Sequence, residues 1–409
     1  MNGELCCRSC GAPLSVTFAD LGSSPLSNSY IPGDRSRAME PTYPLHAYVC
    51  ERCFLVQLEV VQSREHIFSE YAYFSSYSDS WLAHSRNYAG MAIDRLGLTA
   101  QSLVIEAASN DGYLLQYFVY AGVRVLGVEP ARNVAAVALD RGIATENVFL
   151  GEASGGELRR RYGAADLLIA NNVIAHVPDV HDFFGGLAAL LAERGSLTVE
   201  FPHLMRLIEG VEFDTIYHEH FSYYSLHSLE GVLEAHNLAA YDVEELSTHG
   251  GSLRVWIGHK GAFEESASLG NFRRRERDFG ITSIGVYRDF SAKIALRKRQ
   301  VLRFLLDAAE QKKSVVGYGA PAKGNTLLNY CGVGTDLLQY TVDRNPAKVG
   351  TLLPGSRIPV FETDRYKQTK PDYIFILPWN LRDEVVAQNA FAREWGARFV
   401  VAMPELEIF

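Results

Sequence analysis

The sequence predicts an α/β protein of three domains, in which a small cysteine-containing domain precedes two Rossmann-like domains. Three observations favour this fold class. Two Cys-x-x-Cys pairs lie near the N-terminus, and short apolar runs alternate with helical segments from about residue 100 and again from about residue 314. Alternating strands and helices build a parallel sheet whose binding site lies at the carboxyl ends of the strands. We place the domains at residues 1–75, 76–260 and 261–409.

Composition narrows the class of protein. The chain has 409 residues, of which 47% are hydrophobic and 21% charged, as is typical of a globular protein with two or three cores. The net charge of −9 disfavours a nucleic-acid or anionic-membrane partner. No apolar run approaches the roughly 20 residues that a membrane span needs. Glu4 and cysteines stand where a signal peptide would be basic and apolar, so we expect a cytoplasmic protein.

The first domain carries a predicted structural zinc site. Its ligands are Cys7, Cys10, Cys50 and Cys53. Two thiolates separated by two residues point to one side of a tight turn, and two such turns form a closed tetrahedral site. In a reducing compartment, paired cysteines more often hold metal than form disulfides. The alternative is a set of free buried thiols. Cys6 is a less well spaced alternative ligand, and Cys331 is expected to be a buried small residue.

The second domain begins with a strand, a turn and a helix. Strands are predicted at Leu103–Glu106, Val123–Glu129, Asp166–Ala170 and Ser196–Phe201, and the first helix at Asp111–Phe118. A dinucleotide-binding fold would have Gly-x-Gly-x-x-Gly after the first strand, whereas this loop has one glycine, Gly112. Glu106 and Glu129 end the first two strands, and a carboxylate at the second position can accept both ribose hydroxyls of a nucleoside.

This arrangement suits S-adenosylmethionine better than NAD, because S-adenosylmethionine has no phosphate to bind. The predicted cofactor-binding residues are Glu106, Ala108, Asn110, Gly112, Glu129 and Asn171. The alternative is an α/β sheet on which Glu129 is simply solvated.

The third domain is a second Rossmann-like unit that follows a charged helical region at residues 270–312. Its strands are predicted at Ser314–Ala320, Tyr340–Asp343 and Tyr373–Leu377. Glycines between strand and helix let backbone N–H groups approach a phosphate, and the helix N-terminus and Lys323 add positive potential. The pyrophosphate of a nucleotide sugar fits best, and a vestigial sheet with a tight turn is the alternative. The predicted substrate-binding residues are Tyr318, Gly319, Ala320, Lys323, Asn325, Asp343 and Asn345. Trp379 and Asn380 are further pocket candidates.

Seven stretches, spread over nearly the whole chain, resemble the nucleotide-sugar C-methyltransferase family, which includes the C-3′-methyltransferase of tetronitrose biosynthesis. They are Cys7–Cys10, Cys50–Cys53, Asn110–Gly112, Ala175–Pro178, Phe213–Phe221, His249–Gly251 and Val316–Lys323. The resemblance implies a zinc-binding domain, a class I methyltransferase domain and a C-terminal domain that binds the nucleotide sugar, in a monomer. One departure is that the family's first loop commonly has glycine, where this chain has Ala107, Ala108 and Ser109.

The resemblance also implies methyl transfer from S-adenosylmethionine to C-3 of a nucleotide-linked 4-keto-deoxy sugar, with dTDP or GDP as the nucleotide. A sugar carbon becomes acidic beside a ketone, so the reaction needs a base of near-neutral pKa and a donor for the enolate oxygen. By resemblance the base is His220. Tyr73 and Tyr217 would lie near the keto oxygen, Glu219 would orient an imidazole or bind a sugar hydroxyl, and His176 is a secondary acid or base.

Two other functions stay open on the sequence. One is an NAD-dependent nucleotide-sugar oxidoreductase built on the Gly317–Gly319 loop, although the full glycine trio is missing from both Rossmann-like units. The other is a non-catalytic, zinc-clipped binding protein of a polysaccharide cluster. Metal binding by His218 and His220 is a further alternative, but no third ligand has suitable spacing.

Overall fold

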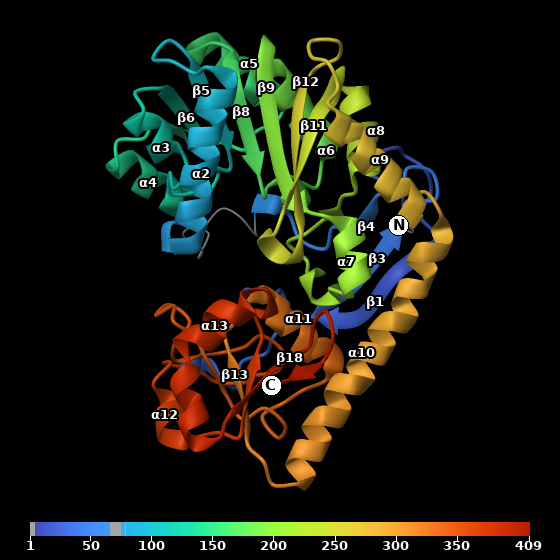
Figure 1. Cartoon of the computed structure of the whole chain (residues 1–409), viewed down its shortest axis with the longest axis vertical. Coiled ribbons are helices and arrows are strands. Elements are labelled where there is room, and N and C mark those ends of the chain that lie inside the picture. The colour runs from blue at the N-terminus through green and yellow to red at the C-terminus, as the bar shows by residue number, and fades with distance from the viewer. Residues whose placement is uncertain (1–4, 66–74, 78) are drawn as a thin grey trace.

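The computed structural model of the chain describes residues 5–65, 75–77 and 79–409. Two α/β units lie one above the other in Figure 1, and the N-terminal strands and the long helix α10 (Ile284–Glu310) run along one side of both. The predicted α/β fold class with a small N-terminal domain and two Rossmann-like domains is confirmed. The exact boundaries between the domains stay predictions.

The N-terminal sheet is antiparallel and joins parts of the chain that are far apart in sequence. Its order is β1 (Val16–Ser24), β3 (Tyr43–Val49), β4 (Val56–Leu58) and β10 (Ser222–Tyr223). The last of these strands follows the histidine-rich segment of the second domain. A second small pair joins β2 (Ile31–Pro32) to β15 (Thr351–Leu352) of the third domain. The N-terminal domain therefore makes backbone hydrogen bonds to both of its neighbours.

The second domain has a seven-stranded sheet in the order β11-β12-β9-β8-β5-β6-β7, in which β12 runs antiparallel to the other six strands. The strands are β5 (Leu103–Ala107), β6 (Arg124–Val128), β7 (Thr145–Glu146), β8 (Ala165–Asn171), β9 (Leu191–Pro202), β11 (Leu238–Leu246) and β12 (Ser252–His259). The helices are α2 (Asp79–Leu96), α3 (Leu115–Tyr120), α4 (Arg132–Asp140), α5 (Glu152–Tyr162), α6 (Val180–Leu190), α7 (Leu204–Gly210), α8 (Leu226–Ala235) and α9 (Ala267–Phe279). Every residue of β5 is buried, as expected of a strand with helices on both faces.

The first helix of this domain starts later than the sequence predicted. Residues from Asp111 were expected to be helical, but α3 begins at Leu115. Asn110 and Gly112 adopt left-handed φ values of 49° and 77°, which an α-helix does not contain. The strand-to-helix connection is therefore a loop, in which the N–H of Ala108 donates to the carbonyl of Val128 over 2.8 Å.

The third domain has a six-stranded sheet in the order β16-β14-β13-β17-β18-β19, parallel except for its last strand. The strands are β13 (Val315–Tyr318), β14 (Thr341–Val342), β16 (Val360–Phe361), β17 (Tyr373–Ile376), β18 (Arg398–Val401) and β19 (Glu407–Ile408). The helices are α11 (Ala322–Cys331), α12 (Arg365–Thr369) and α13 (Arg382–Gln388). The charged region before this domain forms two helices, because Gly280 ends α9 in a left-handed conformation with φ 95°.

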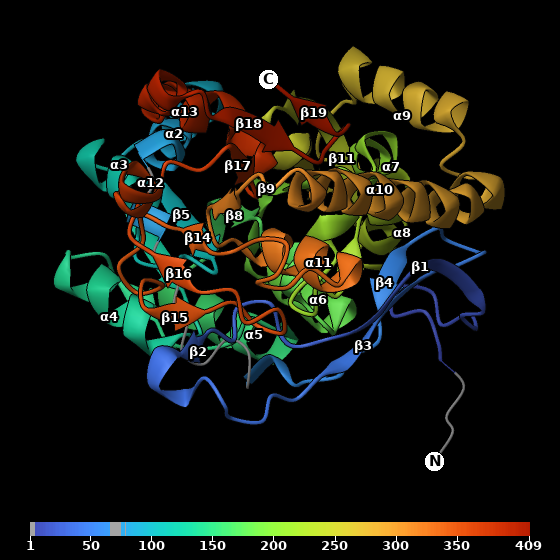
Figure 2. The ribbon, with the colours of Figure 1, turned by 90° about the horizontal axis from the view of Figure 1, so that it is seen from below.

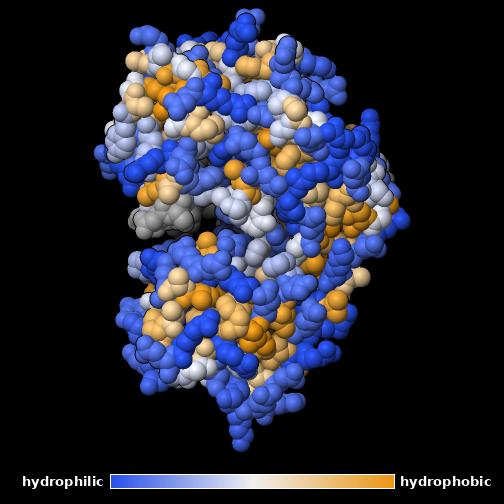
Figure 3. Space-filling model, viewed as in Figure 1, coloured by the Kyte–Doolittle hydropathy of each residue, from blue (hydrophilic) through white to orange (hydrophobic). Residues whose placement is uncertain are grey.

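One hydrophobic core runs through all three domains. Phe18 of β1 stacks on Phe290 of α10 with ring centres 4.4 Å apart, and this core continues to buried side chains of α7, α11 and β13. Figure 2 shows α10 and α11 beside the N-terminal strands. Figure 3 shows a recess between the upper and lower parts of the molecule. Within the described ranges, no helix is both long and apolar enough to cross a membrane.

Candidate active site

Four cysteines come together as predicted for a zinc site. Their Sγ atoms all lie within 4.8 Å of one another, and the pairs Cys7–Cys53 and Cys10–Cys50 are each 3.5 Å apart. A tetrahedral zinc ion with Zn–S bonds of about 2.3 Å needs sulphurs close to this separation. The amide of Gln57 donates to the sulphur of Cys7 over 3.1 Å, which favours a thiolate. The donor set therefore fits zinc.

The other two cysteines are separate from this cluster. Cys6 is exposed and does not belong to the group of four, and Cys331 is buried in the core of the third domain, as predicted. Zinc would hold the two knuckles together without an open coordination position, so its role is structural.

The carboxyl ends of β5, β6 and β8, where the predicted cofactor-binding residues lie, are here called the cofactor edge. Glu129 holds the backbone of this edge in place through two hydrogen bonds. One carboxylate oxygen accepts the N–H of Asn110 and the other accepts the N–H of Ala131, each over 2.8 Å. Each oxygen keeps a second lone pair with which it can accept a ribose hydroxyl. Burial raises the pKa of Glu129, and the two N–H groups partly offset that rise. Ala108, at the departure from the family's glycine, has φ 55°, a conformation that glycine adopts without strain.

Several buried polar atoms at this edge have no hydrogen-bond partner among the described residues. They are Glu106 Oε2, Ser109 Oγ, Asp111 Oδ1, Asn171 Oδ1 and Asn172 Nδ2. Burial raises the pKa of Glu106 well above its usual value. Unpaired buried polar atoms are rare in folded proteins, so their concentration at the ends of β5 and β8 fits a polar cofactor that would satisfy them. The predicted cofactor-binding residues thus lie together at one edge of the sheet.

The segment from Tyr217 to His220 holds the predicted base in one tautomer. Nδ1 of His220 lies 3.0 Å from the carbonyl oxygen of Thr215 and must donate to it, because a carbonyl oxygen only accepts. Nε2 therefore carries the lone pair, and the hydroxyl of Tyr217 donates to it over 2.9 Å. A general base needs such a lone pair on a nitrogen that faces a proton donor.

His176 lies directly beside His220. The two ring centres are 4.7 Å apart, and Nδ1 of His176 donates to the carbonyl oxygen of Glu219 over 2.8 Å. Burial lowers the pKa of His176 to about 4. Burial and the neighbouring His176 hold the pKa of His220 well below its usual value. Both imidazoles are therefore neutral at neutral pH.

Glu219 is anchored by the N-terminal domain. The amide of Asn28 donates to both of its carboxylate oxygens over 2.7 and 2.9 Å, and burial raises the pKa of Glu219 to about 7. His218 points the other way, where its Nε2 donates to the carbonyl of Pro44 over 3.0 Å, so it does not share a metal site with its neighbour. Tyr73 lies outside the described residues. The other four predicted catalytic residues lie together.

Glu212, Asp214 and Lys323 form a cluster of ionisable groups between the histidine segment and the third domain, here called the interdomain charge cluster. Nε1 of Trp379 donates to Asp214 over 2.7 Å, while Nζ of Lys323 donates to Asn380 over 2.9 Å and lies 4.7 Å from the ring centre of Trp379. Burial raises the pKa of Asp214 to about 6. Burial, together with Asp214, raises the pKa of Glu212 to about 9. Asp214 and Glu212 in turn act on the charge of Lys323, so this lysine, near the start of α11, lies close to the second domain.

The predicted pyrophosphate loop after β13 is held by Asp343. The N–H of Ala320 donates to one carboxylate oxygen over 2.7 Å, and the N–H of Asn345 donates to the other over 2.8 Å. Nζ of Lys348 donates to the carbonyl of Ala320 over 2.7 Å. Since a carboxylate already occupies the Ala320 N–H, an anionic ligand has its favourable approach from the side of Lys323 and Lys348.

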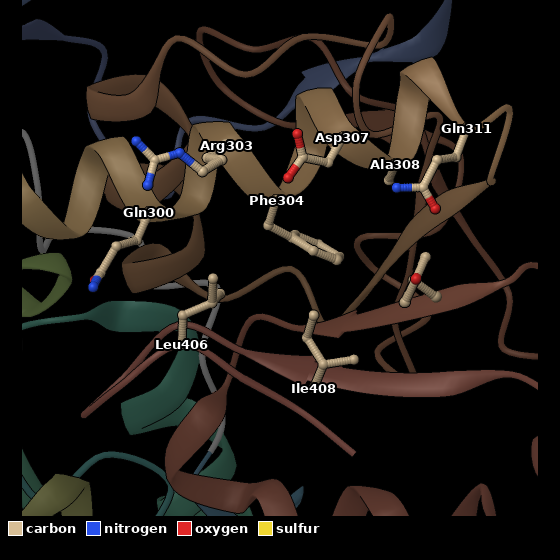
Figure 4. A pocket seen from close by; sticks show the side chains of 9 residues that line it. Gln300, Arg303, Phe304, Asp307, Ala308, Gln311, Leu406 and Ile408 are labelled. Atoms are coloured by element: carbon tan, nitrogen blue, oxygen red, sulfur yellow. The ribbon is translucent and has the colours of Figure 1, made fainter.

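Tyr318 and Asn325 lie on different sides of this loop. Tyr318 contributes to a cavity of about 370 Å³ near the carboxyl ends of β13 and β14, lined by Tyr318, Arg344, Thr363, Asp364, Tyr366, Lys367, Gln388, Asn389 and Phe391. The amide of Asn325 instead donates to the carbonyl of Ser27 over 2.7 Å. Another cavity, of about 380 Å³ between α10 and β19, contains none of the predicted site residues (Figure 4).

Some residues of the site were missed by the sequence analysis. Glu200, at the end of β9, accepts from Nε2 of His84 over 3.0 Å and from Nε of Arg254 over 2.7 Å. An acidic residue at the end of a predicted strand was the available signal. Asn28 carried no signal, because the insertion between the cysteine pairs showed no periodicity that would place it near Glu219.

Comparisons with known proteins agree with the predicted fold class. Family models match in order: a zinc binding domain at residues 7–68, a methyltransferase domain at 81–243 and a C-methyltransferase C-terminal domain at 247–404. The C-methyltransferase NovU of Streptomyces niveus is 37% identical over 400 residues, which are 98% of this chain and 95% of NovU.

Two solved structures of methyltransferases each resemble less than half of the chain. Magnesium protoporphyrin IX methyltransferase of Synechocystis PCC 6803, with bound S-adenosylmethionine, is 16% identical, covers 45% of this chain and 82% of its own, and has a TM-score of 0.33. The 1,6-didemethyltoxoflavin-N1-methyltransferase of Burkholderia thailandensis is 21% identical, covers 44% and 81%, and has a TM-score of 0.34.

The fold and the cofactor edge define an S-adenosylmethionine-dependent methyltransferase with a structural zinc site. The chain belongs to the C-methyltransferase family, since it matches a relative in that family over nearly its whole length and carries the family's C-terminal domain. It is therefore an S-adenosylmethionine-dependent C-methyltransferase, and this class is favoured over the oxidoreductase and the non-catalytic protein.

The zinc site predicts that Cys50→Ser lowers both metal content and stability. Binding of structural zinc contributes directly to folding free energy, so losing one thiolate should lower the unfolding midpoint markedly. Metal analysis and thermal unfolding of the purified protein measure both effects. The matched control is Cys6→Ser, which should keep one zinc ion per chain. A zinc-free wild type with full stability would contradict the assignment.

The interdomain charge cluster predicts a pH-dependent stability. The pKa of Glu212 rises from 4.5 to about 9, so between these values the folded protein holds a proton that the unfolded chain releases. Stability therefore falls as pH rises through this window. Glu212→Gln should raise the free energy of unfolding at pH 8, on the order of 2 kcal/mol, and should change it less at pH 5.

Urea unfolding at the two pH values measures this difference. Glu209→Gln is the control, because Glu209 is a more exposed residue of the same region. An equal effect of Glu212→Gln at both pH values would show that the carboxyl group of Glu212 titrates normally.

Proposed function

We propose that this C-methyltransferase methylates C-3 of a nucleotide-linked 4-keto-deoxy sugar through an enolate that His220 generates. The observation that carries the proposal is the fixed tautomer of His220, whose ring lies beside His176 and is affected by the charge of Lys323. A carbon atom accepts a methyl group only as a carbanion or enolate. A neutral imidazole beside a keto sugar is suited to form that enolate.

The surroundings of His220 support proton removal. Its low pKa keeps the imidazole unprotonated, so no proton must leave before catalysis. The hydroxyl of Tyr217 already donates to Nε2 and can move to a substrate oxygen when the substrate C–H replaces it. The carboxyl group of Glu219, with a pKa of about 7, lies on the same segment and can bind a sugar hydroxyl. The role of Tyr73 near the keto oxygen stays a prediction from the sequence.

The position of Lys323 supports a nucleotide-linked substrate. This lysine begins α11, and its charge affects the pKa of both Asp214 and His220, so it lies near the two. A diphosphate held by Lys323 would leave the attached sugar beside His220. The cavity that contains Tyr318 also offers Arg344, Lys367 and aromatic rings, which suit a dTDP or GDP moiety.

Three of the residues predicted to bind the nucleotide sugar, Asp343, Asn345 and Asn325, make contacts within the protein. Asp343 and Asn345 shape the loop at Gly319 and Ala320, and the anionic groups would contact Lys323 from the far side of that loop. Asn325 braces α11 against the N-terminal domain. The proposed enzyme is a monomer that works in the cytoplasm, where S-adenosylmethionine is available and the four zinc thiolates stay reduced.

Glu129→Ala should weaken S-adenosylmethionine binding by roughly 1.5–3 kcal/mol, because it removes a charged acceptor for the ribose hydroxyls. Titration calorimetry with S-adenosylmethionine measures the affinity. Glu157→Ala, on an exposed helix surface, is the control and should leave the affinity unchanged. Unchanged affinity in Glu129→Ala would remove Glu129 from the ribose site, and tight NAD binding would contradict the assignment of the edge.

His220→Asn should abolish both methyl transfer and solvent deuterium exchange at C-3, while substrate still binds. Loss of a general base costs on the order of 10² to 10⁴ in rate. The assay uses a panel of dTDP- and GDP-linked 4-keto-deoxy sugars and follows C-3 exchange by NMR with S-adenosylhomocysteine bound. Exchange isolates proton removal from methyl transfer.

His227→Asn, at an exposed position, is the matched control and should exchange like the wild type. Wild-type exchange in His220→Asn would show that another group is the base, and His176→Asn is then the next variant to assay. A wild type that neither exchanges nor methylates any sugar of the panel would refute the proposed substrate class.

A further inference from the structure

The turn between β11 and β12 carries a histidine that the proposed mechanism has not used. Residues Thr248–Gly250 form a short 3₁₀ turn in which His249 has φ 57° and ψ 18°. Few side chains other than asparagine, aspartate and histidine adopt this left-handed conformation, and it costs about 1 kcal/mol or more per residue. Such strain persists where the surrounding structure imposes it, and it concentrates at functional sites.

The two glycines after His249 fix where its side chain lies. A Cβ atom on Gly250 would come within 2.6 Å of both Glu212 and Trp379, and one on Gly251 within 2.8 Å of Arg206. The N–H of His203 also donates to the carbonyl of Gly251 over 2.9 Å. The turn is therefore wedged between α7 and the third domain, and only glycine fits at these two positions.

In Figure 1 this turn is the yellow connection at the lower edge of the second domain, facing the third domain. Its sequence, a histidine followed by two glycines, thus places one imidazole at the junction of the two units.

The imidazole of His249 lies between the cofactor loop and Lys323. The ring of Trp81 is 5.6 Å from His249, 4.9 Å from His84 and 6.2 Å from Tyr113, the residue that follows Gly112 of the cofactor loop. Burial, together with the charge of Lys323, lowers the pKa of His249 to about 4. Glu200 raises that pKa, while His84 and His176 lower it. Groups from four elements therefore surround this neutral ring.

Neither ring nitrogen of His249 has a hydrogen-bond partner among the described residues. The other histidines of the site make hydrogen bonds within the protein: His220 with Thr215 and Tyr217, His176 with Glu219, and His84 with Glu200. A half-buried imidazole with unused nitrogens, held in a strained conformation beside the cofactor loop, is arranged for a ligand.

We propose that His249 is a catalytic residue whose ring N–H donates a hydrogen bond to the carbonyl oxygen of the sugar. This role rests on the proposed function. When His220 takes the C-3 proton, the electron pair of the C–H bond forms the C-3–C-4 double bond and the oxygen on C-4 becomes negative. His249 stabilises that charge. As C-3 bonds to the methyl group, the carbonyl re-forms and the methyl–sulphur bond of S-adenosylmethionine breaks, which gives S-adenosylhomocysteine.

A neutral imidazole suits this role. Its N–H can donate a hydrogen bond to the enolate oxygen without any change in protonation state. A donor that is already in position in a water-poor site stabilises the negative charge more than a donor in water does. The hydroxyl of Tyr217, which donates to Nε2 of His220 before the substrate C–H replaces it, would then be a second donor beside His249.

The test compares His249→Gly with the wild type on the same keto-sugar panel. Glycine keeps the left-handed backbone and removes the donor, so the protein should unfold at the same or a higher temperature. Both C-3 deuterium exchange and kcat should fall about 10²- to 10³-fold, as when an oxyanion donor is lost. The affinity for S-adenosylmethionine should stay within about threefold of the wild type, a difference below 1 kcal/mol.

Two further variants sharpen the result. His249→Asn keeps the left-handed backbone and an N–H donor, so it should recover part of the exchange that His249→Gly loses. Lys312→Gly is the control for backbone strain, because Lys312 is an exposed residue with a left-handed φ of 57° in another part of the chain. This substitution should leave the rates of C-3 exchange and methyl transfer unchanged.

Wild-type exchange in a folded His249→Gly protein would overturn the role of His249 and leave the proposed function standing. Loss of methyl transfer with exchange intact would also overturn it, because His249 would then act after enolate formation. If the wild type exchanges no sugar of the panel, the proposed substrate falls, and the role of His249 falls with it.

Discussion

The rest of the site depends on the hydrogen bond from Nδ1 of His220 to the carbonyl oxygen of Thr215, because this bond fixes the tautomer of His220. The short segment that contains both residues is held from all three domains. Trp379 donates to Asp214, and the hydroxyl of Thr326 donates to the carbonyl of Ile216 over 3.0 Å. These two contacts come from the third domain. The N-terminal domain contributes the contacts to His218 and Glu219. A displacement of any domain would therefore move the imidazole.

The sheet of the second domain alone would therefore not form the proposed active site. The sheet of the second domain supplies the cofactor edge at Glu106 and Glu129, but the groups proposed to act on the sugar leave that sheet and extend into the junction. Zinc contributes at a distance, because it fixes the first domain. That domain in turn supplies Asn28 to Glu219 and the strands that pair with β10. Structural metal and catalytic geometry are thus linked through backbone pairing and one continuous core.

Burial sets the protonation states of the junction. It keeps His176, His220 and His249 neutral and raises the pKa of Asp214, Glu212 and Glu219. A neutral imidazole can accept a proton at one nitrogen or donate a hydrogen bond from the other without first exchanging a proton with water. The folded protein holds these carboxyl groups at raised pKa values, so its stability falls as the pH rises from about 4 to about 9.

The sequence predicted the fold class and much of the candidate site, and the reasons for its misses are physical. Cysteine spacing and the strand-ending acids are local signals, so the zinc cluster and the cofactor edge could be found. The start of α3 was wrong because the left-handed φ of Asn110 and Gly112 is set by the loop. The contact of Asn28 with Glu219 spans 191 residues, and no local pattern carries it. The sequence also did not show that the side chain of Lys323 lies near the second domain, because a helix start does not indicate which neighbouring domain its side chains face.

The central claim is that one sugar lies between the cofactor edge and the third domain, at the junction of the domains. The most direct measurement is a crystal structure of the enzyme with S-adenosylhomocysteine and a dTDP-linked 4-keto-deoxy sugar. The account predicts the homocysteine sulphur at the edge of β5 and β8, the diphosphate beside Lys323, and sugar C-3 within about 3.5 Å of Nε2 of His220, as a reacting pair requires. A nucleotide sugar bound in the groove between α10 and β19, or one whose sugar turns away from the histidine segment, would contradict it.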